Sequence, residues 1–515
     1  MNTKILKLVT LLLALLMCVS CFVACDGNGD NGNDTGTGTG TGSGTSTGDD
    51  TVDETSPEII YRPASVNYDN YEYVIVAPNQ NEFGNGHFCA VEGAEDIINE
   101  SLRRRETLMA DKYGVVMKLN TTYGSEINKT VIQKNRTKQY FADLVFYTAT
   151  QGMTSAQSGC FYDLNSLEEL NLEAPYWDQR IQQDYRIGDM LFQVVGDIDT
   201  LDELVTFGFI YGVVAYNSMN YQETYGSPYD LVRNGQWTFN LMLTMATPYT
   251  TNVDEDPNMG IGDKWGLLTE CQATYYLFIG TGIKPISSSN GELQLNLKDS
   301  ITYNKAAGAL EEILRMASNE KVAYAERDFA GSYGDAAAIF KANRALFRTS
   351  SLSTTMGLGD MQDDFGILPI PMYVANQEGG YYNMVAATGN WPLMIPKSVG
   401  DSRVSKVANI AEIISYHSRF GDDEPLYESF FERLTSLKIC RSDNDKEMLM
   451  LIFDSKVFDF DQTTKVMDIY TQITNMASNK TDVGAVSTML SGAVSTGDTK
   501  LNSIIETFNK SNSSN

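Results

Sequence analysis

The alternation of short apolar strands with amphipathic helices most limits what this chain can fold into. Residues 71–77 (YEYVIVA) and 142–147 (ADLVFY) are apolar runs typical of buried strands. Between them, residues 95–112 place apolar residues such as Ile98 and Leu102 at helical spacing. The alternation predicts an α/β fold. Further strands are expected at 115–119, 190–195, 205–216, 345–347 and 365–369, further helices at 306–317 and 407–414, and mostly helix from 425 onward.

The N-terminal segment has the composition of an export signal. Lys4 precedes the apolar run 5–18 and Lys7 lies near its start, and the run is too short to span a bilayer comfortably. Small residues stand just before Cys25, as a lipoprotein signal requires, so we expect a signal peptide at 1–24 and lipid attachment to the Cys25 thiol. Cys21 is the competing attachment site, and an ordinary secretory signal is the alternative.

A linker is expected to follow, because residues 25–57 are almost entirely Gly, Thr, Ser, Asp and Asn. Such a segment buries too little apolar surface to fold and behaves as a flexible coil. The folded body then begins near residue 61 and is long enough for two domains. With a lipid on Cys25, the body would be held at the extracellular face of the cytoplasmic membrane.

Charge and rare residues exclude several classes of function. The chain has 38 Lys and Arg against 66 Asp and Glu, a formal net charge of -28. So acidic a surface repels phosphate backbones, which argues against nucleic acid and suits uncharged or cationic solutes. With only His87 and His417, a histidine-based zinc site or a Ser-His-Asp triad has little to assemble from. We therefore expect no metal, no cofactor and no catalytic residues.

The cysteines of the body are widely spaced and form no CxxC pair. Metal binding by these residues is therefore not expected, and buried free thiols are favoured. Their disulfide state stays open at this point. The residues concerned are Cys89, Cys160, Cys271 and Cys440.

Six segments of the body resemble, in chain order, the motifs of one known family. The clearest is PYDLVRNGQWT at 228–238, in which Trp237 is expected to pack at a helix start that Thr238 caps. Another resembles a recurrent Gly-Lys strand, although Asp189 stands where lysine is commoner. Together the motifs resemble the extracellular solute-binding proteins of bacterial ABC importers, the family of maltose-binding protein, in its clostridial carbohydrate-binding lipoprotein branch. The segments are 95–105, 187–192, 213–217, 228–238, 365–371 and 447–459.

The resemblance implies a two-lobed, periplasmic-binding-protein-like fold of type II, with a hinge and an interlobe ligand cleft. By the order of the matches, lobe one comprises residues 61–206 plus 381–421, and lobe two residues 207–380 plus 422–515. It also implies a monomer that binds a small-molecule solute between its lobes, closes on it, and delivers it to ABC transporter permease subunits. Such closure needs a ligand with higher affinity for the closed form.

Carbohydrate is the expected ligand. Sugar rings pack their C–H faces on aromatic planes, and their hydroxyls need polar partners. The chain supplies 28 Tyr and 4 Trp. We expect Trp177 and Trp391 to be ligand-binding aromatics, and Gln151, Asp199 and Arg348 to be polar ligand-binding residues after predicted strands. For each of them, packing in the core or contact with solvent is the alternative role.

Two other functions stay open on the sequence alone. A secreted glycoside hydrolase needs only two facing carboxylates, which 66 acidic residues easily supply. A binding protein for a peptide or another non-sugar solute would have a related fold. Stoichiometric binding without turnover separates a receptor from a hydrolase.

Overall fold

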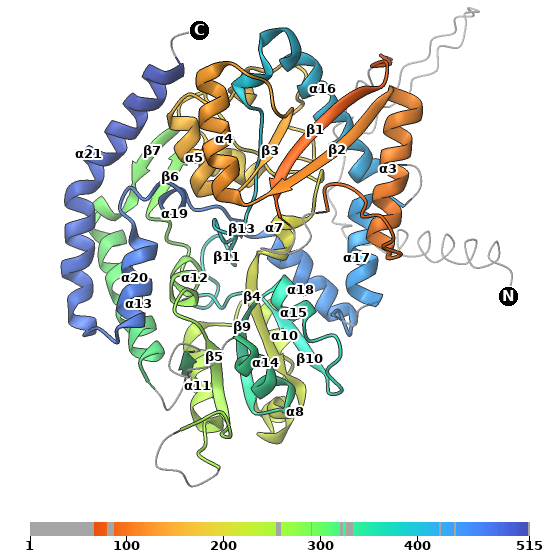
Figure 1. Ribbon diagram of the computed structural model, residues 1–515. Coiled ribbons are helices and arrows are strands. Elements are labelled where there is room, and N and C mark those ends of the chain that lie inside the picture. Colours follow the sequence, from red (N-terminus) through yellow and green to blue (C-terminus); the bar gives the residue numbers. More distant parts are fainter. Residues whose placement is uncertain are drawn as a thin grey trace, which may run out of the picture. The chain divides into compact units, whose positions relative to one another are not determined.

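Two larger β-sheets form the framework of the protein, as the computed structural model shows (Figure 1). The structure describes residues 66–79, 87–253, 259–289, 291–319, 323–325, 333–421, 424–436 and 439–512. All of these fall within one compact unit, Ile59–Asn515. The expected signal peptide, Cys25 and the linker at 25–57 lie outside the described residues, and they stay predictions.

The first sheet has the strand order β12-β3-β1-β2. β1 (Tyr71–Pro78) runs parallel to β2 (Val115–Thr122), with Tyr71 opposite Val115 and Pro78 opposite Thr122. β3 (Leu144–Phe146) is parallel to β1 on its other side, and β12 (Leu393–Met394) is antiparallel to β3. The carboxyl ends of β1, β2 and β3 therefore lie at the same edge of the sheet.

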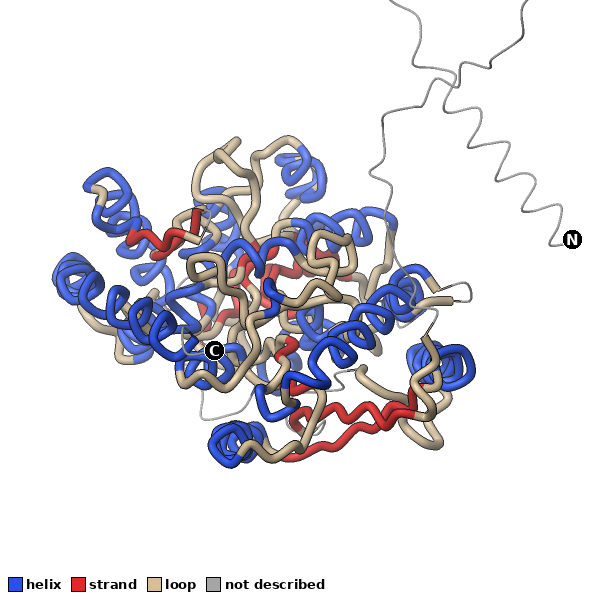
Figure 2. Tube along the Cα trace, turned by 90° about the horizontal axis from the view of Figure 1, so that it is seen from above, coloured by secondary structure: helices blue, strands red, loops and turns tan. Residues whose placement is uncertain are grey.

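Helices follow the strands of the first sheet in the expected order. α3 begins where the Asp96 carboxylate accepts hydrogen bonds from two backbone N–H groups, and it ends at Gly114, whose φ of 60° suits glycine. The Tyr73 hydroxyl donates to the carbonyl of Val407 at 3.0 Å, which ties α16 to the sheet. In the view from above, helices lie to both sides of the strands (Figure 2). The helices around this sheet are α3 (Ile97–Tyr113), α4 (Gly124–Thr137), α5 (Ala149–Gln157) and α16 (Asp401–Phe420).

The second sheet has the strand order β10-β4-β9-β5-β8. β4 is antiparallel to both β10 and β9, whereas β5 runs parallel to β9 and to β8. Trp237, Trp265 and Phe347 are buried beside this sheet, and the rings of Trp237 and Phe347 lie 5.3 Å apart. The strands are β4 (Phe207–Gly212), β5 (Trp265–Thr269), β8 (Ala323–Ala325), β9 (Ala345–Ser351) and β10 (Phe365–Leu368).

Most of the remaining elements pack around the second sheet or follow it toward the C-terminus. A two-stranded hairpin, β6 (Ile286–Ser289) with β7 (Glu292–Leu295), stands apart from both sheets. The helices are α6 (Gln179–Tyr185), α7 (Leu201–Leu204), α8 (Val213–Ser218), α9 (Tyr221–Tyr225), α10 (Pro228–Arg233), α11 (Phe239–Tyr249), α12 (Ala273–Ile279), α13 (Ser300–Ala317), α14 (Tyr333–Lys341), α15 (Leu352–Met356), α17 (Leu426–Ser436), α18 (Asp443–Asp454), α19 (Phe460–Thr464), α20 (Ile469–Ser478) and α21 (Val486–Asn512).

The chain passes between the two sheets at segments that lie against one another. Thr206, just before β4, forms an antiparallel bridge with Val385, which lies between β10 and β12. Next to this bridge, β11 (Asn383–Met384) pairs in parallel with β13 (Lys456–Val457). We call residues 205–206 and 383–390 the crossover segments. The lobe boundaries at 206/207, 380/381 and 421/422 remain predictions.

The α/β fold class predicted from the sequence is confirmed, but two expected strands differ. Of the apolar stretch 205–216, only Phe207–Gly212 is a strand, and Val213–Ser218 is helix α8. The pairing of β4 with β10 ends at Gly212 opposite Phe365, and the next N–H, that of Val213, donates to the carbonyl of Asp364. The Tyr-Asn pair therefore lies on a helix and not at a strand end.

The other difference is at 190–195, which has no strand. Val194 forms a single bridge with Leu393, and the N–H of Leu191 donates to the Asp163 carboxylate instead of a neighbouring strand. An apolar run can thus be buried by loop contacts as well as by a sheet.

Among the described residues, the four cysteines of the body form no disulfide, and three of them are buried, as the sequence favoured. Within the described residues, no group of three or more His, Cys, Asp or Glu side chains is placed to hold a metal ion. No helix in the described part of the chain combines the length and the apolar character needed to cross a membrane.

Candidate functional site

The strand ends of both sheets are attached to the same crossover segments. From the first sheet, the N–H of Ala149 at the start of α5 donates to the carbonyl of Asn390 at 3.0 Å. From the second sheet, the N–H of Leu352 just after β9 donates to the carbonyl of Thr206 at 3.3 Å. The two crossover segments are themselves joined, because Ala386 N–H donates to the Val205 carbonyl at 3.3 Å. Ligands of open α/β sheets bind outside the carboxyl ends of the strands, so this region is a candidate site.

The second sheet contributes a polar hollow at the ends of the parallel strands β5 and β9. Its volume is about 40 Å³. Arg348, expected from the sequence to bind ligand, lies on β9 and lines this hollow, as does Glu270 just after β5. The Thr349 and Thr269 hydroxyl oxygens are 3.3 Å apart. The lining residues are Phe207, Leu268, Thr269, Glu270, Arg348, Thr349, Ser350, Ser351 and Thr354. A hollow of this size is too small to be a complete ligand pocket.

The first sheet contributes Gln151, which was also expected to bind ligand. It lies in the first turn of α5, where its N–H donates to the capping hydroxyl of Thr148. Its side-chain Oε1 is buried and accepts no hydrogen bond from any described residue. The same edge carries the start of α4, since a Cβ on Gly124 would lie 3.7 Å from Gln151 Oε1. We call Phe207, Glu270, Arg348 and Thr349 the strand-end site, and Gln151 lies at the corresponding edge of the first sheet.

Trp391 lies just beyond the crossover segment 383–390. Its ring is 2% exposed and stacks on Phe88, with the ring centroids 6.4 Å apart. In this conformation, the ring faces the core of the first sheet. Its role as a ligand-binding aromatic remains a prediction.

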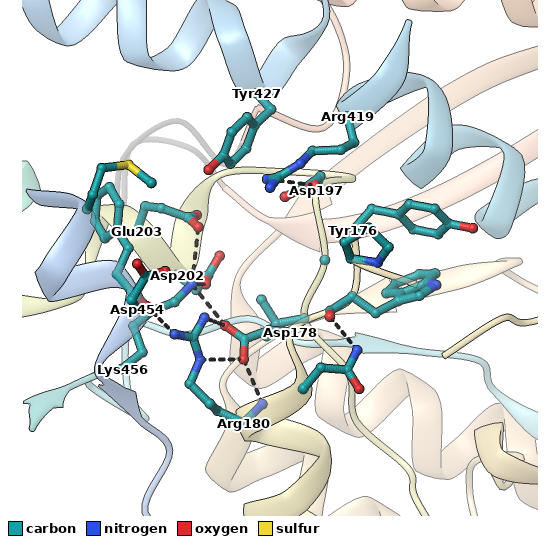
Figure 3. Close-up of a pocket in the computed structure, with 17 residues that line it drawn as sticks. Tyr176, Asp178, Arg180, Asp197, Asp202, Glu203, Arg419, Tyr427, Asp454 and Lys456 are labelled. Atoms are coloured by element: carbon teal, nitrogen blue, oxygen red, sulfur yellow. Dashed lines mark hydrogen bonds and ion pairs between the residues drawn. The ribbon is translucent and has the colours of Figure 1, made fainter. Parts of the chain in front are cut away.

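A second and larger pocket, of about 380 Å³, lies where α6, α7, α17 and α18 approach one another (Figure 3). Trp177, the other expected aromatic, lines it but is 1% exposed. Its indole N–H donates to Glu412 at 2.9 Å, and the Tyr176 hydroxyl donates to the same carboxylate. The lining residues are Pro175, Tyr176, Trp177, Asp178, Gln179, Arg180, Val195, Gly196, Asp197, Asp202, Glu203, Arg419, Tyr427, Met450, Phe453, Asp454 and Lys456.

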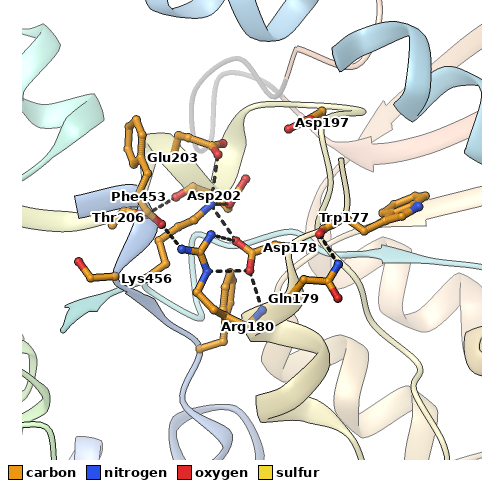
Figure 4. Close-up of polar contacts among 12 residues, drawn as sticks. Trp177, Asp178, Gln179, Arg180, Asp197, Asp202, Glu203, Thr206, Phe453 and Lys456 are labelled. Atoms are coloured by element: carbon orange, nitrogen blue, oxygen red, sulfur yellow. Dashed lines mark hydrogen bonds and ion pairs between the residues drawn. The ribbon is translucent and has the colours of Figure 1, made fainter. Parts of the chain in front are cut away.

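An ion network centred on Lys456 forms one wall of this pocket (Figure 4). The Lys456 ammonium, whose side chain is 4% exposed, pairs with Asp178 at 3.1 Å, with Glu203 at 3.1 Å and with Asp202. Burial alone would lower the pKa of Lys456, but the surrounding carboxylates raise it well above its usual value. Arg180 adds a two-pronged contact to Asp178, with N–O distances of 2.9 and 2.7 Å.

Asp197 and Asp199 lie between α6 and α7 in the chain, and only Asp197 lines the pocket. Burial raises the pKa of Asp197 to about 7, despite Arg419 at 3.4 Å. Asp199, the residue expected from the sequence, is buried and accepts the Leu201 N–H at 2.8 Å, so its carboxylate helps to begin α7. Burial raises its pKa well above the usual value.

The five residues expected to bind ligand therefore fall in three places. Arg348 and Gln151 lie at strand ends attached to the crossover, and Trp391 lies in the adjacent core. Trp177 lies on the larger pocket and forms a bridge with Gly196, three residues before the buried Asp199. Sequence reasoning missed the Lys456 network. Its only local signal was the acidic run at 197–203, because Lys456 lies 254 residues from Asp202.

The larger pocket suits a structural role better than solute capture. Each of its three lining cations already pairs with a carboxylate of the same pocket: Arg180 with Asp178, Arg419 with Asp197, and Lys456 with three partners. A ligand would have to displace one of these pairs. Lys456 also belongs to β13, beside the crossover, so the network joins α6 and α7 to that segment.

Comparison with known proteins adds evidence on the fold. No protein-family model matches the chain, and no curated protein matches it. Among solved structures, the maltose/maltodextrin-binding domain of Bdellovibrio bacteriovorus bound to maltotriose matches with a TM-score of 0.51 at 14% identity, over 84% of this chain and 100% of that one. A cyclo/maltodextrin-binding protein complexed with maltotetraose matches with a TM-score of 0.50 at 14% identity, over 85% of this chain and 96% of the other. The protein therefore has the two-lobed α/β fold of periplasmic substrate-binding proteins.

Proposed function

We propose that this protein is an extracellular solute-binding lipoprotein that captures a carbohydrate and delivers it to the permease of an ABC transporter. One observation carries the proposal: polar strand ends of two sheets are attached to shared crossover segments in this fold. The two comparable structures hold maltotriose and maltotetraose, which supports an oligosaccharide as the ligand class.

The strand-end site has the chemistry that a sugar needs. Glu270 and Arg348 supply an acceptor and a donor for hydroxyl groups, and Thr349 can do both. Phe207, whose ring lies 4.3 Å from that of Tyr276, adds an aromatic wall. We propose that the lobes close over the sugar and that contacts from the Gln151 side complete the site, so that the closed form has the higher affinity.

The proposal includes the N-terminal features. A diacylglycerol anchor on Cys25 holds the protein at the outer face of the cytoplasmic membrane, and the linker at 25–57 separates the body from the lipid surface. The protein is proposed to act as a monomer, without cofactor and without turnover of its ligand.

A thermal-shift screen tests the function. Purified protein is heated with maltose, maltotriose, maltotetraose, other oligosaccharides, amino acids and short peptides, because a ligand that binds only the folded state raises the melting temperature. We expect a rise with one class of sugar and recovery of that sugar intact. A rise only with amino acids or peptides would contradict the sugar, and cleavage of the sugar would favour a glycoside hydrolase.

A matched pair of variants places the ligand. Glu270→Gln removes the charge of the strand-end acceptor while keeping its size, and Glu292→Gln makes the same change at an exposed position on the β6–β7 hairpin. We expect Glu270→Gln to weaken sugar binding by about tenfold, as the loss of a charged hydrogen bond would. Glu292→Gln should bind like the unmodified protein. Equal affinities for both variants would place the sugar elsewhere.

A further inference from the structure

Tyr123 is an aromatic side chain whose exposure nothing in the described fold explains. It is 61% exposed. Tyr140 is exposed as well, but its hydroxyl donates to Asp143 and the Arg403 guanidinium lies 4.6 Å from its ring. Phe420, also exposed, packs its ring on Tyr176. Tyr123, by contrast, makes no side-chain hydrogen bond and no ring contact with any described residue.

Its position is one where local stability favours another residue. Tyr123 is the N-cap of α4, and its side chain makes no capping hydrogen bond. Asn, Asp, Ser and Thr stabilise this position because their side chains accept a backbone N–H. The helices α3, α5 and α11 have such caps in Asp96, Thr148 and Thr238, whereas α8, α12 and α16, like α4, begin without one. What sets Tyr123 apart is that its ring stabilises neither the helix start nor the core, which leaves the ring available to a ligand.

Its location is the carboxyl edge of the first sheet. Tyr123 directly follows Thr122, the last residue of β2, and precedes Gly124. A Cβ on Gly124 would lie 3.7 Å from Gln151 Oε1, which accepts no hydrogen bond from any described residue. An exposed ring and an unused acceptor therefore lie at neighbouring positions of the same edge.

We propose that Tyr123 is a specificity-determining residue whose ring stacks on a pyranose ring of the bound oligosaccharide, with the Gln151 amide as the adjacent polar contact. This inference rests on the proposed function. Stacking suits this ring because a sugar presents an apolar C–H face to it while its hydroxyls remain free for polar partners. The contact extends the strand-end site to the first sheet and favours chains of several sugar rings over single rings.

The test uses a substitution with two opposite expected effects. Tyr123→Asn removes the ring and installs a favourable N-cap, so we expect a higher melting temperature without ligand and an affinity for the sugar roughly threefold to tenfold weaker. Tyr123→Phe keeps the ring and should bind within twofold of the unmodified protein. Ile301→Ala, an exposed apolar position on α13, is the control for surface changes and should leave affinity unchanged.

Tyr123→Trp gives an independent signal. The tryptophans at 177, 237, 265 and 391 are all buried, so a tryptophan at 123 would be the exposed fluorophore and should shift to the blue and gain protection from acrylamide when the sugar binds. Sugar binding with unchanged affinity in Tyr123→Asn, or no spectral change in Tyr123→Trp, overturns the inference and leaves the proposed function standing. Failure of the unmodified protein to bind any carbohydrate overturns both.

Discussion

Replacing Lys456 with methionine should destabilise the protein strongly. Methionine matches the apolar stem of lysine up to Cε but lacks the terminal ammonium. Asp178 retains Arg180, whereas Asp202 and Glu203 have no other cation within ion-pair distance among the described residues. Removing one partner from a buried charged network costs about 3–5 kcal/mol, because the remaining charges stay buried and unpaired. We expect a loss in this range at pH 7.5.

The loss should depend on pH in a defined direction. Burial already raises the pKa of Asp202 well above its usual value, and removal of the Lys456 ammonium, which lowers that pKa, raises it further. A raised carboxyl pKa stabilises the folded state at low pH, and this contribution is lost as pH rises through the folded-state value. The difference between Lys456→Met and the unmodified protein should therefore be smaller at pH 5 than at pH 8.

Urea unfolding followed by tryptophan fluorescence measures both effects. Lys298→Met is the matched control, because its pair with Asp498 is exposed, with side chains 53% and 48% accessible, and such pairs contribute only about 0–1 kcal/mol. Adding Asp202→Asn to Lys456→Met should restore part of the lost stability. A loss for Lys456→Met no larger than that for the control would refute the account of the network.

Three further predictions concern stability. Asp197→Asn should flatten the dependence of stability on pH between about 4 and 7 and should stabilise the protein at pH 8 by about 1–4 kcal/mol. Burial raises the pKa of Asp197 to about 7, so the stability that this carboxyl group confers below about pH 4 is lost as pH rises through its folded-state pKa. An unchanged pH profile in urea titrations would contradict this. Gly266→Ala should lower the unfolding free energy by at least about 2 kcal/mol, because a Cβ there would overlap the Ala246 carbonyl oxygen, and chemical denaturation would show the loss. Thr238→Ala should cost about 1 kcal/mol by removing the cap of α11, with Thr244→Ala on the exposed face of the same helix as the control.

The sequence predicted the features that depend on neighbours along the chain. The helix at 95–112 corresponds to α3, and Thr238 caps α11 by accepting the Leu241 N–H at 3.2 Å, with Trp237 buried beside it, as expected. Both follow from local patterns of apolar spacing and capping side chains, which a single segment contains. The fold class followed from the same alternation of strands and helices.

The features that failed or were missed depend on contacts distant in sequence. The chain leaves the sheet after Gly212 because the pairing with the partner strands β9 and β10 ends there, and nothing in the sequence of residues 213–216 indicates this. Lys456 and its carboxylates form one network only because the fold brings β13 next to α6 and α7. Tyr123 looks like an ordinary residue between a strand and a helix until its exposure and missing cap contact are seen together.

The central claim is that the protein binds an intact carbohydrate, one ligand to each chain. Calorimetric titration of the purified protein with maltotriose, maltotetraose and other oligosaccharides, followed by chromatography of the released ligand, tests it most directly. The account predicts saturable binding with a stoichiometry of one and recovery of the sugar unchanged. Absence of heat with every sugar, or recovery of shortened sugars, would contradict it.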